Sequence, residues 1–434
     1  MKTNTPVRYN ERTHEGAIAS RTNAEQQLRR SVLAAMLWED QFYEDGVSIA
    51  DRITALVAEV DPAKVAALAI EAREKMKLRH VPLWIVRTMA RLPKHKALAA
   101  DTLATVIQRP DELSEFVALY WKDGRQPLSA QVKKGLARAF QKFTAYSLAK
   151  YDQDGAVKLR DVLFLCHAKP KDEEQAAIWK MLVDGTLPTP DTWEVSLSSG
   201  ADKRGTWEKM LAENTLGGLA LLRNLRNMVQ AGVRPALVFA ALGKMNVERI
   251  LPFRFISAAK VVPQWESQIE QVMLKCLAGR DKLPGKTVLL VDVSGSMDAA
   301  ISTKSDLNRI DAANGLAILA RELCDDVAIY SFSNQLVRIP SRHGFALRDA
   351  ITTSQPHSGT KLGAALSGLN AAEKYDRLII ITDEQSSDVV PAPNGRGYVI
   401  NVASYKNGVG YGAWTHIDGW SEAVFDFISE VELT

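Results

Sequence analysis

The stretch that most constrains the fold is a run of four apolar residues, Val288–Val291, which is followed at once by polar side chains. A continuous apolar run of this length is typical of a strand that is buried on both faces of a parallel sheet. Asp292, Ser294 and Ser296 follow at alternate positions, and Gly295 allows the backbone to turn sharply. Because ligands of open α/β sheets bind just beyond the carboxyl ends of the strands, the sequence predicts a ligand site here.

Two later segments supply further oxygen ligands at the same edge of the predicted sheet. Thr360 lies in a loop before a helical run, and Asp383 follows a buried strand predicted over Arg377–Thr382. Hydroxyl and carboxylate oxygens are the hard ligands that Mg²⁺ or another divalent cation prefers. The predicted metal site therefore consists of Asp292, Ser294, Ser296, Thr360 and Asp383. The alternative is that these side chains only cap strand ends in Asx and Ser turns.

A chain of 434 residues is too long to fold around one ordinary hydrophobic core, which indicates two domains. No apolar run approaches the ~20 residues of a membrane span, and the N-terminus lacks the apolar core of a secretory signal. Cys166, Cys276 and Cys324 are far apart and lack the spacing of a metal site. We therefore expect reduced, buried thiols in a cytoplasmic protein. The protein is also expected to be monomeric.

The charge is divided unevenly along the chain. From Lys286 onward there are 12 Lys and Arg against 18 Asp and Glu, a net charge of −6. The preceding part has 42 basic against 33 acidic residues, a net charge of +9. A basic N-terminal part is compatible with an anionic partner such as nucleic acid, although solvated lysine faces are also common.

The part between residues 24 and 283 has a helical period throughout, and residues 1–23 are expected to form an arm. Because helices of about 12 residues cannot each bury a face alone, we expect a solenoid of stacked helices in the manner of HEAT repeats; an irregular bundle is the alternative. The expected helices are Ala24–Glu39, Ile49–Val60, Pro62–Lys77, Val81–Leu92, Lys96–Gln108, Asp111–Trp121, Ala130–Lys142, Leu159–Cys166, Asp172–Val183, Trp207–Asn214, Leu216–Gln230, Arg234–Leu242 and Gln264–Leu277.

Residues 284–434 alternate between strands and helices, which predicts a doubly wound α/β domain. The expected strands are Thr287–Val291, Val327–Phe332, Leu336–Ile339, Arg377–Thr382 and Tyr398–Val402. The expected helices are Asn308–Leu323, Phe345–Thr353, Leu362–Glu373 and Gly419–Val431. The fold class is therefore multidomain, with an all-α region followed by an α/β sheet.

Several stretches, together with this pairing of domains, resemble one family. They are K-L-R-D-V-L-F-L-C-H-A-K-P (Lys158–Pro170), L-G-G-L-A-L-L-R-N-L-R-N-M (Leu216–Met228), R-H-V-P-L-W-I-V-R-T-M-A (Arg79–Ala90) and the D-V-S-G-S of the sheet domain. The chain resembles the Ro autoantigen family, whose TROVE module of HEAT-like helical repeats precedes a von Willebrand factor A (vWA) domain. It is similar to the short members of bacterial or phage type.

The resemblance implies a specific fold and function. The helical repeats would form a ring closed by the vWA domain, and the five metal-site residues resemble a metal-ion-dependent adhesion site that captures a carboxylate of a protein partner. The ring would bind small structured noncoding RNAs (Y RNAs) on its outer surface and single-stranded 3′ ends of misfolded RNAs in its hole. It would act in RNA stability and quality control, with an exoribonuclease as a possible partner.

The resemblance also assigns residues to the RNA surface. His167, in L-C-H-A-K-P, and Lys150, in L-A-K-Y, match a family histidine and lysine on that surface. A further basic position of the family is Asp154 here, which departs from the pattern. By helical spacing alone, four more cations share one side of a helix and would extend this surface, unless they form an ordinary solvated face: Lys133, Lys134, Arg138 and Lys142.

The sequence favours a binding protein over an enzyme. No nucleophile elbow, G-x-S-x-G, surrounds Ser294 or Ser296, and there is no H-E-x-x-H or paired-cysteine motif. The principal hypothesis is an RNA-binding ring of the Ro type. The alternative is a metal-dependent protein-interaction scaffold without RNA, which needs the same metal site.

Overall fold

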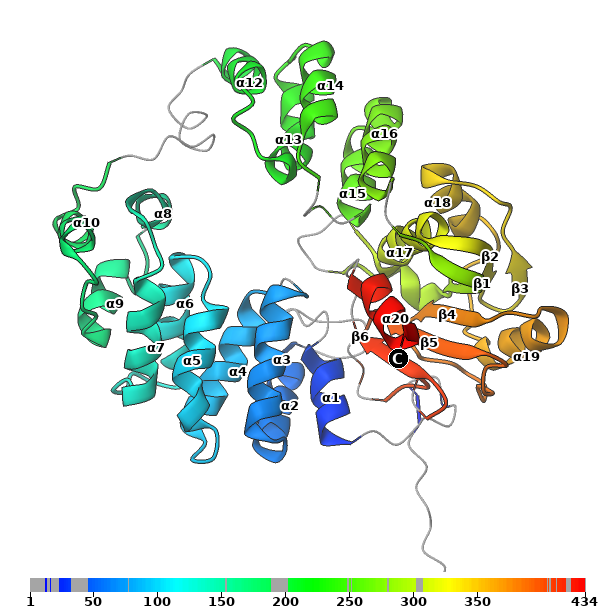
Figure 1. Ribbon diagram of the computed structural model, residues 1–434, viewed down its shortest axis with the longest axis horizontal. Coiled ribbons are helices and arrows are strands. Elements are labelled where there is room, and N and C mark those ends of the chain that lie inside the picture. The colour runs from blue at the N-terminus through cyan, green and yellow to red at the C-terminus, as the bar shows by residue number, and fades with distance from the viewer. Residues whose placement is uncertain are drawn as a thin grey trace, which may run out of the picture. The chain divides into compact units, whose positions relative to one another are not determined.

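The chain folds into two compact units. One consists mainly of residues 46–201, and the other contains residues 202–434 together with the N-terminal segment up to Ala34 (Figure 1). The computed structural model describes residues 12–13, 16, 23–32, 46–76, 78–152, 154–188, 202–247, 250, 252–278, 281–301, 307–403, 405, 407–410, 412–418 and 423–433. The end of the helix expected over Ala24–Glu39, most of the arm and the start of the helix expected over Gly419–Val431 lie outside these residues.

The unit of residues 46–201 is helical, as expected. Helix α3 packs on α4, α4 on α5, α5 on α7, and α7 on α9, so the helices stack in succession. Its helices are α2 (Gly46–Glu59), α3 (Pro62–Glu74), α4 (His80–Arg91), α5 (Lys96–Val106), α6 (Asp111–Tyr120), α7 (Ala130–Phe140), α8 (Ala145–Tyr151), α9 (Leu159–Cys166) and α10 (Glu173–Asp184).

Side-chain caps begin several of these helices, and close packing holds two of them together. The carboxylate of Asp61 accepts hydrogen bonds from the first backbone N–H groups of α3, and the hydroxyl of Ser129 accepts one at the start of α7. Helices α5 and α7 meet at Gly135, where a Cβ would lie 2.8 Å from the carbonyl oxygen of Ala100 and 2.9 Å from Cβ of Leu103. Only glycine allows this approach.

The second unit contains further helices, and those that precede the sheet most closely in sequence, over residues 252–277, lie against its α/β part. Lys260 Nζ lies 2.5 Å from Asp311 Oδ2, and the Glu270 carboxylate accepts a 2.6 Å hydrogen bond from the backbone N–H of Phe345. These helices are α1 (Ala24–Val32), α12 (Lys203–Ala212), α13 (Gly218–Gln230), α14 (Pro235–Lys244), α15 (Pro252–Val261) and α16 (Glu266–Leu277). The helical region therefore divides near residue 202, and its second part packs with the sheet.

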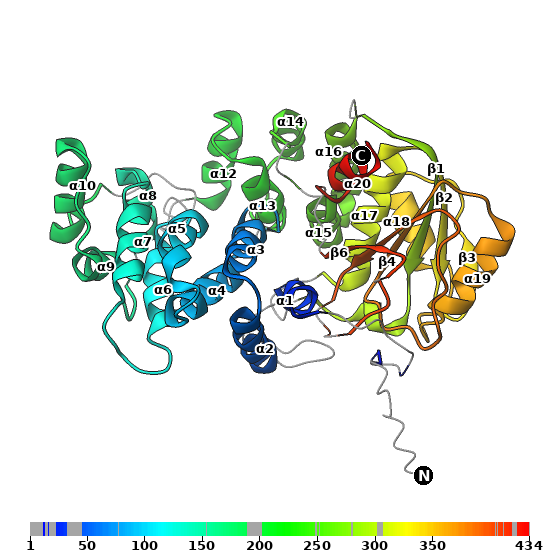
Figure 2. The same cartoon turned by 60° about the horizontal axis from the view of Figure 1, so that its bottom comes forward.

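The sheet has six strands in the order β3-β2-β1-β4-β5-β6, all parallel except β3 (Figure 1; Figure 2 gives a second view of the sheet). The strands are β1 (Leu283–Asp292), β2 (Cys324–Phe332), β3 (Leu336–Arg338), β4 (Arg377–Thr382), β5 (Arg396–Asn401) and β6 (Thr415–Asp418). The helices between and after them are α17 (Arg309–Leu323), α18 (Gly344–Thr352), α19 (Leu362–Ala372) and α20 (Ala423–Leu433). This confirms the predicted class of a helical region followed by a doubly wound α/β domain.

The central strand β1 is buried on both faces, as its apolar run predicts. Val288 and Leu290 pack in a cluster with Leu362 and Leu366 of α19, and α17 packs against β1, β2 and β4. Since β1 is followed by β2 on one side and pairs with β4 on the other, the strand order reverses at its carboxyl end. This is the position at which open α/β sheets bind ligands. Among the described residues, no helix is both long and apolar enough to span a bilayer.

Candidate functional site

The five predicted metal-site residues lie on three neighbouring loops at the carboxyl edge of the sheet. Asp292 ends β1, Ser296 lies in the short 3-10 helix over Gly295–Asp298, and Asp383 directly follows β4. The side chains of four of the five are buried, and only Ser296 is half-buried: Asp292, Ser294, Thr360 and Asp383 have relative exposures of 5% or less.

Hydrogen bonds fix the orientation of the Asp292 carboxylate. Its Oδ1 accepts a 2.8 Å bond from the backbone N–H of Ser294, and its Oδ2 accepts a 2.6 Å bond from the Thr382 hydroxyl. The hydroxyl oxygens of Ser294 and Ser296 lie 3.2 Å apart. The acid and both serines therefore converge at one point beyond the strand end.

The loops that carry Thr360 and Asp383 are bonded to each other and to the β1 loop. The Ser358 carbonyl accepts a 2.9 Å bond from the backbone N–H of Gly295, and the Thr360 carbonyl accepts a 2.8 Å bond from the N–H of Ser387. These bonds hold the three segments together, so residues almost a hundred positions apart in sequence share one site.

The charges of the site favour a divalent cation. Burial raises the pKa of Asp292 to about 7, and the neighbouring Asp383 carboxylate contributes to this rise because two buried negative charges repel. Arg309 supplies one positive charge, with Nη1 3.4 Å from Asp383 Oδ2. Two acids with three hydroxyls form a hard-oxygen set suited to Mg²⁺. Within the described residues, no group of three or more His, Cys, Asp or Glu side chains forms another candidate metal site.

The residues predicted for RNA binding lie in the unit of residues 46–201, and two of them meet there. Lys133 of α7 and His167, which ends α9, line one pocket of about 500 Å³. His167 has a left-handed backbone conformation (φ 53°) that terminates α9, and its side chain is exposed. Lys134, next to Lys133, is exposed to solvent.

The other predicted cations are engaged within the fold. Arg138 forms an ion pair with Asp101 of α5, and the Lys142 ammonium donates hydrogen bonds to the carbonyls of Ala104 and Ile107 at the end of α5. Partial burial lowers the pKa of Lys142. The four cations of this segment therefore do not form a single free basic face, because half of them tie α7 and the segment after it to α5.

Lys150 lies on α8, and Asp154, which stands where the family has a basic residue, lies between α8 and α9. Lys150, on α8, is half-buried, and its ammonium lies 5.8 Å from the centre of the Tyr151 ring. The exposed Asp154 carboxylate forms an ion pair of 2.5 Å with Lys158. In place of a basic residue, this position neutralises a neighbouring cation.

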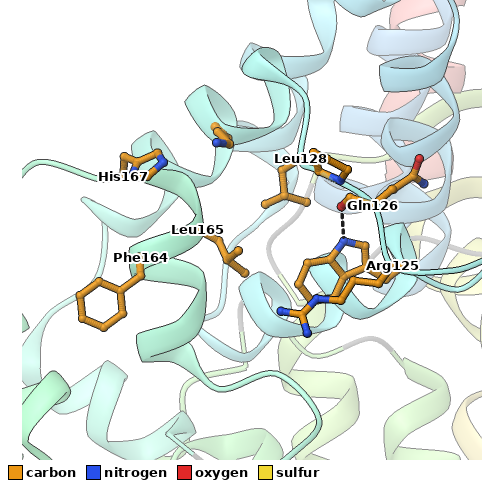
Figure 3. A pocket seen from close by; sticks show the side chains of 9 residues that line it. Arg125, Gln126, Leu128, Phe164, Leu165 and His167 are labelled. Carbon is orange, nitrogen blue, oxygen red and sulfur yellow. Dashed lines mark hydrogen bonds between the residues drawn. The ribbon is translucent and has the colours of Figure 1, made fainter.

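The aromatic residues of the pocket and its arginine were not predicted from the sequence. Trp121 and Arg125 come from the loop after α6, and Phe164 comes from α9. Figure 3 shows Arg125 and Phe164 on different segments of the pocket. The available signal was the segment W-K-D-G-R-Q-P, which places a tryptophan and an arginine in a turn between two helical runs. An analysis of helical periodicity does not detect this segment, because it lies between α6 and α7.

Comparison with known proteins shows similarity to two domain families in two adjacent segments of the chain. Residues 185–283 match the model of the TROVE domain, and residues 287–385 match that of the von Willebrand factor type A domain. Telomerase protein component 1 of Mus musculus is 32% identical over 89 residues, and that of Rattus norvegicus is 30% identical over 89 residues. Each alignment covers 19% of this chain and 3% of the relative, so the chain spans a small part of these proteins.

The fold matches a solved structure over almost the whole chain. The crystal structure of the Deinococcus radiodurans RO (RSR) protein superposes with a TM-score of 0.63 at 18% identity, covering 94% of this chain and 99% of that chain. The chain therefore combines a segment similar to the TROVE domain with a segment similar to the von Willebrand factor type A domain, in the fold of that Ro protein.

Proposed function

We propose that this protein binds small structured noncoding RNA of the Y type on the helical unit of residues 46–201. The observation that carries the proposal is the convergence of Lys133 and His167, 34 positions apart in sequence, at one pocket whose lining contains Arg125 and no acidic residue. The family supplies the class of ligand. The same protein would take the single-stranded 3′ ends of misfolded RNA, in a quality-control role that requires no catalysis.

The physical basis is phosphate neutralisation. Lysine and arginine side chains bind phosphates without reading sequence, and release of counterions makes the affinity depend steeply on salt. A structured RNA is recognised largely by its shape and backbone, which suits cations mounted on rigid helices. Lys134 on α7 and Lys150 on α8 would extend this surface.

The test is a binding titration of a Y-like stem-loop RNA at several salt concentrations. We expect the double variant Lys133→Ala/His167→Ala to bind more weakly, and its salt slope to fall by about one for each phosphate that the variant no longer neutralises. The matched control is Lys180→Ala, because Lys180 is an exposed lysine of the same unit that already pairs with Asp184. Equal affinity and slope in the double variant and the wild type would contradict the proposal.

A second function is favoured by the metal site. We propose that a bound Mg²⁺, held by the five-residue oxygen set, captures an acidic side chain of a protein partner such as an exoribonuclease. Asp292→Ala should abolish capture of that protein and leave RNA binding unchanged. A protein partner lost in Asp292→Ala, with no RNA enriched by the wild type, would favour a metal-dependent scaffold over the RNA-binding role.

A further inference from the structure

Arg309 is an unusual residue for the first position of helix α17. Its surface is only 4% exposed, and its positive charge lies at the end of the helix where the backbone dipoles already leave a partial positive charge. Burial of a cation and its position at this end of a helix both cost free energy. Such a side chain requires negative charge close by.

The acids of the predicted metal site supply this negative charge. Nη1 of Arg309 lies 3.4 Å from Asp383 Oδ2 and 3.5 Å from the carbonyl oxygen of Ser296. The side chains of Asp292 and Asp383 are fully buried, and burial together with the charge of Asp383 raises the pKa of Asp292. One guanidinium therefore offsets part of the charge of two neighbouring acids.

The two contacts of the guanidinium at this site are longer than those of a strong ion pair. A charge-assisted N–H···O bond is typically about 2.7–2.9 Å long. In the same unit Arg377 Nε donates a 2.6 Å bond to Glu432, whereas Arg309 Nη1 lies 3.4 Å from Asp383. Arg309 thus supplies positive charge to Asp383 without a short hydrogen bond to it.

The backbone of Arg309 is held in place independently of its side chain. Its N–H donates a 3.1 Å bond to the carbonyl of Ala299, and Asn308 and Asp311 cap the start of α17 reciprocally. Asp311 also pairs with Lys260 of α15. The guanidinium can therefore leave Asp383 by rotation about side-chain bonds while α17 keeps its position.

We propose that Arg309 is a built-in competitor of the metal ion. Its guanidinium and a divalent cation share the carboxylate of Asp383, so the side chain lowers the affinity of the site for Mg²⁺ and offsets its negative charge when no metal is bound. The inference rests on the proposed Mg²⁺ site and adds regulation to it. Such a site fills and empties with the concentration of free Mg²⁺, and capture of an acidic partner follows.

The alternative is that Arg309 orients Asp383 for the metal. The two roles predict effects of opposite sign. Loss of an orienting side chain weakens metal binding, whereas loss of a competing positive charge strengthens it.

The test is an isothermal titration of the full chain with MgCl₂, after removal of metal by EDTA and dialysis. Arg309→Gln removes the charge and keeps a polar side chain, and we expect its dissociation constant to fall about tenfold or more, since a nearby positive charge no longer opposes the cation. Without metal its Tm should lie below that of the wild type. Saturating Mg²⁺ should raise its Tm by more than that of the wild type.

Two further variants separate charge from packing. Arg309→Met is a second neutral variant with an unbranched stem, and it should bind Mg²⁺ more tightly as well. Arg309→Lys keeps the charge and should remain within about threefold of the wild type. Circular dichroism establishes the temperature range in which each variant is folded, and the titrations are made within that range.

The matched control is Arg321→Gln. Arg321 lies near the other end of α17, where its Nη2 donates a 2.6 Å bond to the Ser341 hydroxyl. This variant also removes one positive charge from the helix, but its dissociation constant for Mg²⁺ should equal that of the wild type.

Failure of the competition and failure of the metal site give different results. If the wild type binds Mg²⁺ and the neutral variants bind it equally or more weakly, the competition is overturned and the metal site remains. An equal gain in Arg309→Lys and Arg309→Gln would also overturn it, because the charge would not be the cause. Absence of Mg²⁺ binding in the wild type and in every Arg309 variant would overturn the site and the competition together.

Discussion

The guanidinium of Arg30 forms an ion pair with the carboxylate of Glu384, although 354 positions separate them in the chain. Both side chains are fully buried. Arg30 also donates 3.1 Å hydrogen bonds to the carbonyls of Tyr405 and Asn407. Burial alone would raise the pKa of Glu384, but Arg30 and His416 lower it to about 2. Helix α1 is thereby fastened to the loop that also carries Asp383.

Replacing Arg30 should strongly destabilise this unit. Arg30→Met leaves the buried charge of Glu384 with His416 as its remaining partner, and removal of one partner of a buried ion pair costs about 3–5 kcal/mol. Urea unfolding followed by circular dichroism measures the loss. The control Arg342→Ala removes an exposed arginine of the same unit and should change the free energy of unfolding by less than about 0.5 kcal/mol. A loss in Arg30→Met no larger than in this control would contradict the prediction.

The C-terminal helix should depend on pH through Glu432. Its carboxylate accepts hydrogen bonds from Arg377 Nε (2.6 Å) and the Tyr398 hydroxyl (2.9 Å). Burial opposes ionisation, but Arg377 and Tyr398 more than offset it and lower the pKa of Glu432. Since the folded-state pKa lies below the unfolded value of about 4.3, this stabilisation is present above pH 4.3 and is lost as the pH falls through the folded-state value.

The measurement is the difference in unfolding free energy between the wild type and Glu432→Gln at pH 7, 5 and 3. The difference should be largest at pH 7 and should shrink at pH 3. Glu213→Gln, at an exposed position of the same unit, should show no such trend. A constant difference at all three values would mean that Glu432 acts through packing instead of charge.

Gly135→Ala should destabilise the helical unit even though alanine is the better helix former. The added Cβ would lie within 3 Å of a backbone oxygen and a Cβ of α5, neither of which moves easily, and such overpacking costs about 1–3 kcal/mol. Gly243→Ala is the matched control, since nothing lies within 4 Å of its Cβ. It should stabilise by roughly 0.5–1 kcal/mol. Thermal unfolding of the two variants should therefore shift in opposite directions.

Mg²⁺ should stabilise the protein by binding at the five-residue oxygen set. Because Asp292 and Asp383 repel each other in a buried site, a cation between them relieves a cost that the folded chain otherwise bears. Binding at 100 times the dissociation constant adds about 2.7 kcal/mol. Differential scanning fluorimetry should show a rise in Tm with Mg²⁺ for the wild type and none for Asp292→Asn. An equal rise in both would locate the cation elsewhere.

Replacement of Lys142 should lower the stability of the protein, whereas replacement of Lys133 should weaken the salt dependence of RNA binding. Lys142→Ala removes hydrogen bonds to the last carbonyls of α5 and should lower stability by about 1 kcal/mol while leaving the salt slope of RNA binding unchanged. Lys133→Ala should reduce that slope with little change in stability. Parallel thermal melts and salt titrations test both. A reduced salt slope in Lys142→Ala would show that Lys142 also neutralises a phosphate of the RNA.

The sheet was predictable because its signals are local. The apolar run Val288–Val291 and the oxygen side chains at alternate positions after it are properties of adjacent residues, and the alternation of strands and helices fixes which strand ends share an edge. The strand β6 and the helices α8 and α15 escaped prediction. The first two have only four and seven residues, and α15 lies between two prolines in a sequence with mixed polarity.

The pocket beside His167 and the contacts of Arg138 and Lys142 with α5 could not be predicted from the sequence, for a different reason. Helical spacing shows that Arg138 and Lys142 share a side, but it does not show that Asp101 and the end of α5 lie opposite them. Trp121 and His167 meet only because α6, α7 and α9 pack together. Such contacts depend on tertiary packing, which no local pattern contains.

The pairing of Arg30 with Glu384 sets an order of events during synthesis. Residues 46–201, which make up almost all of one unit, are translated between the two partners, and Glu384 is made 354 residues after Arg30 of α1. At about 5–20 residues per second, α1 waits roughly 20–70 s for the loop that neutralises its arginine. Helix α1 is therefore made before the helical unit of residues 46–201 but reaches its final place after it.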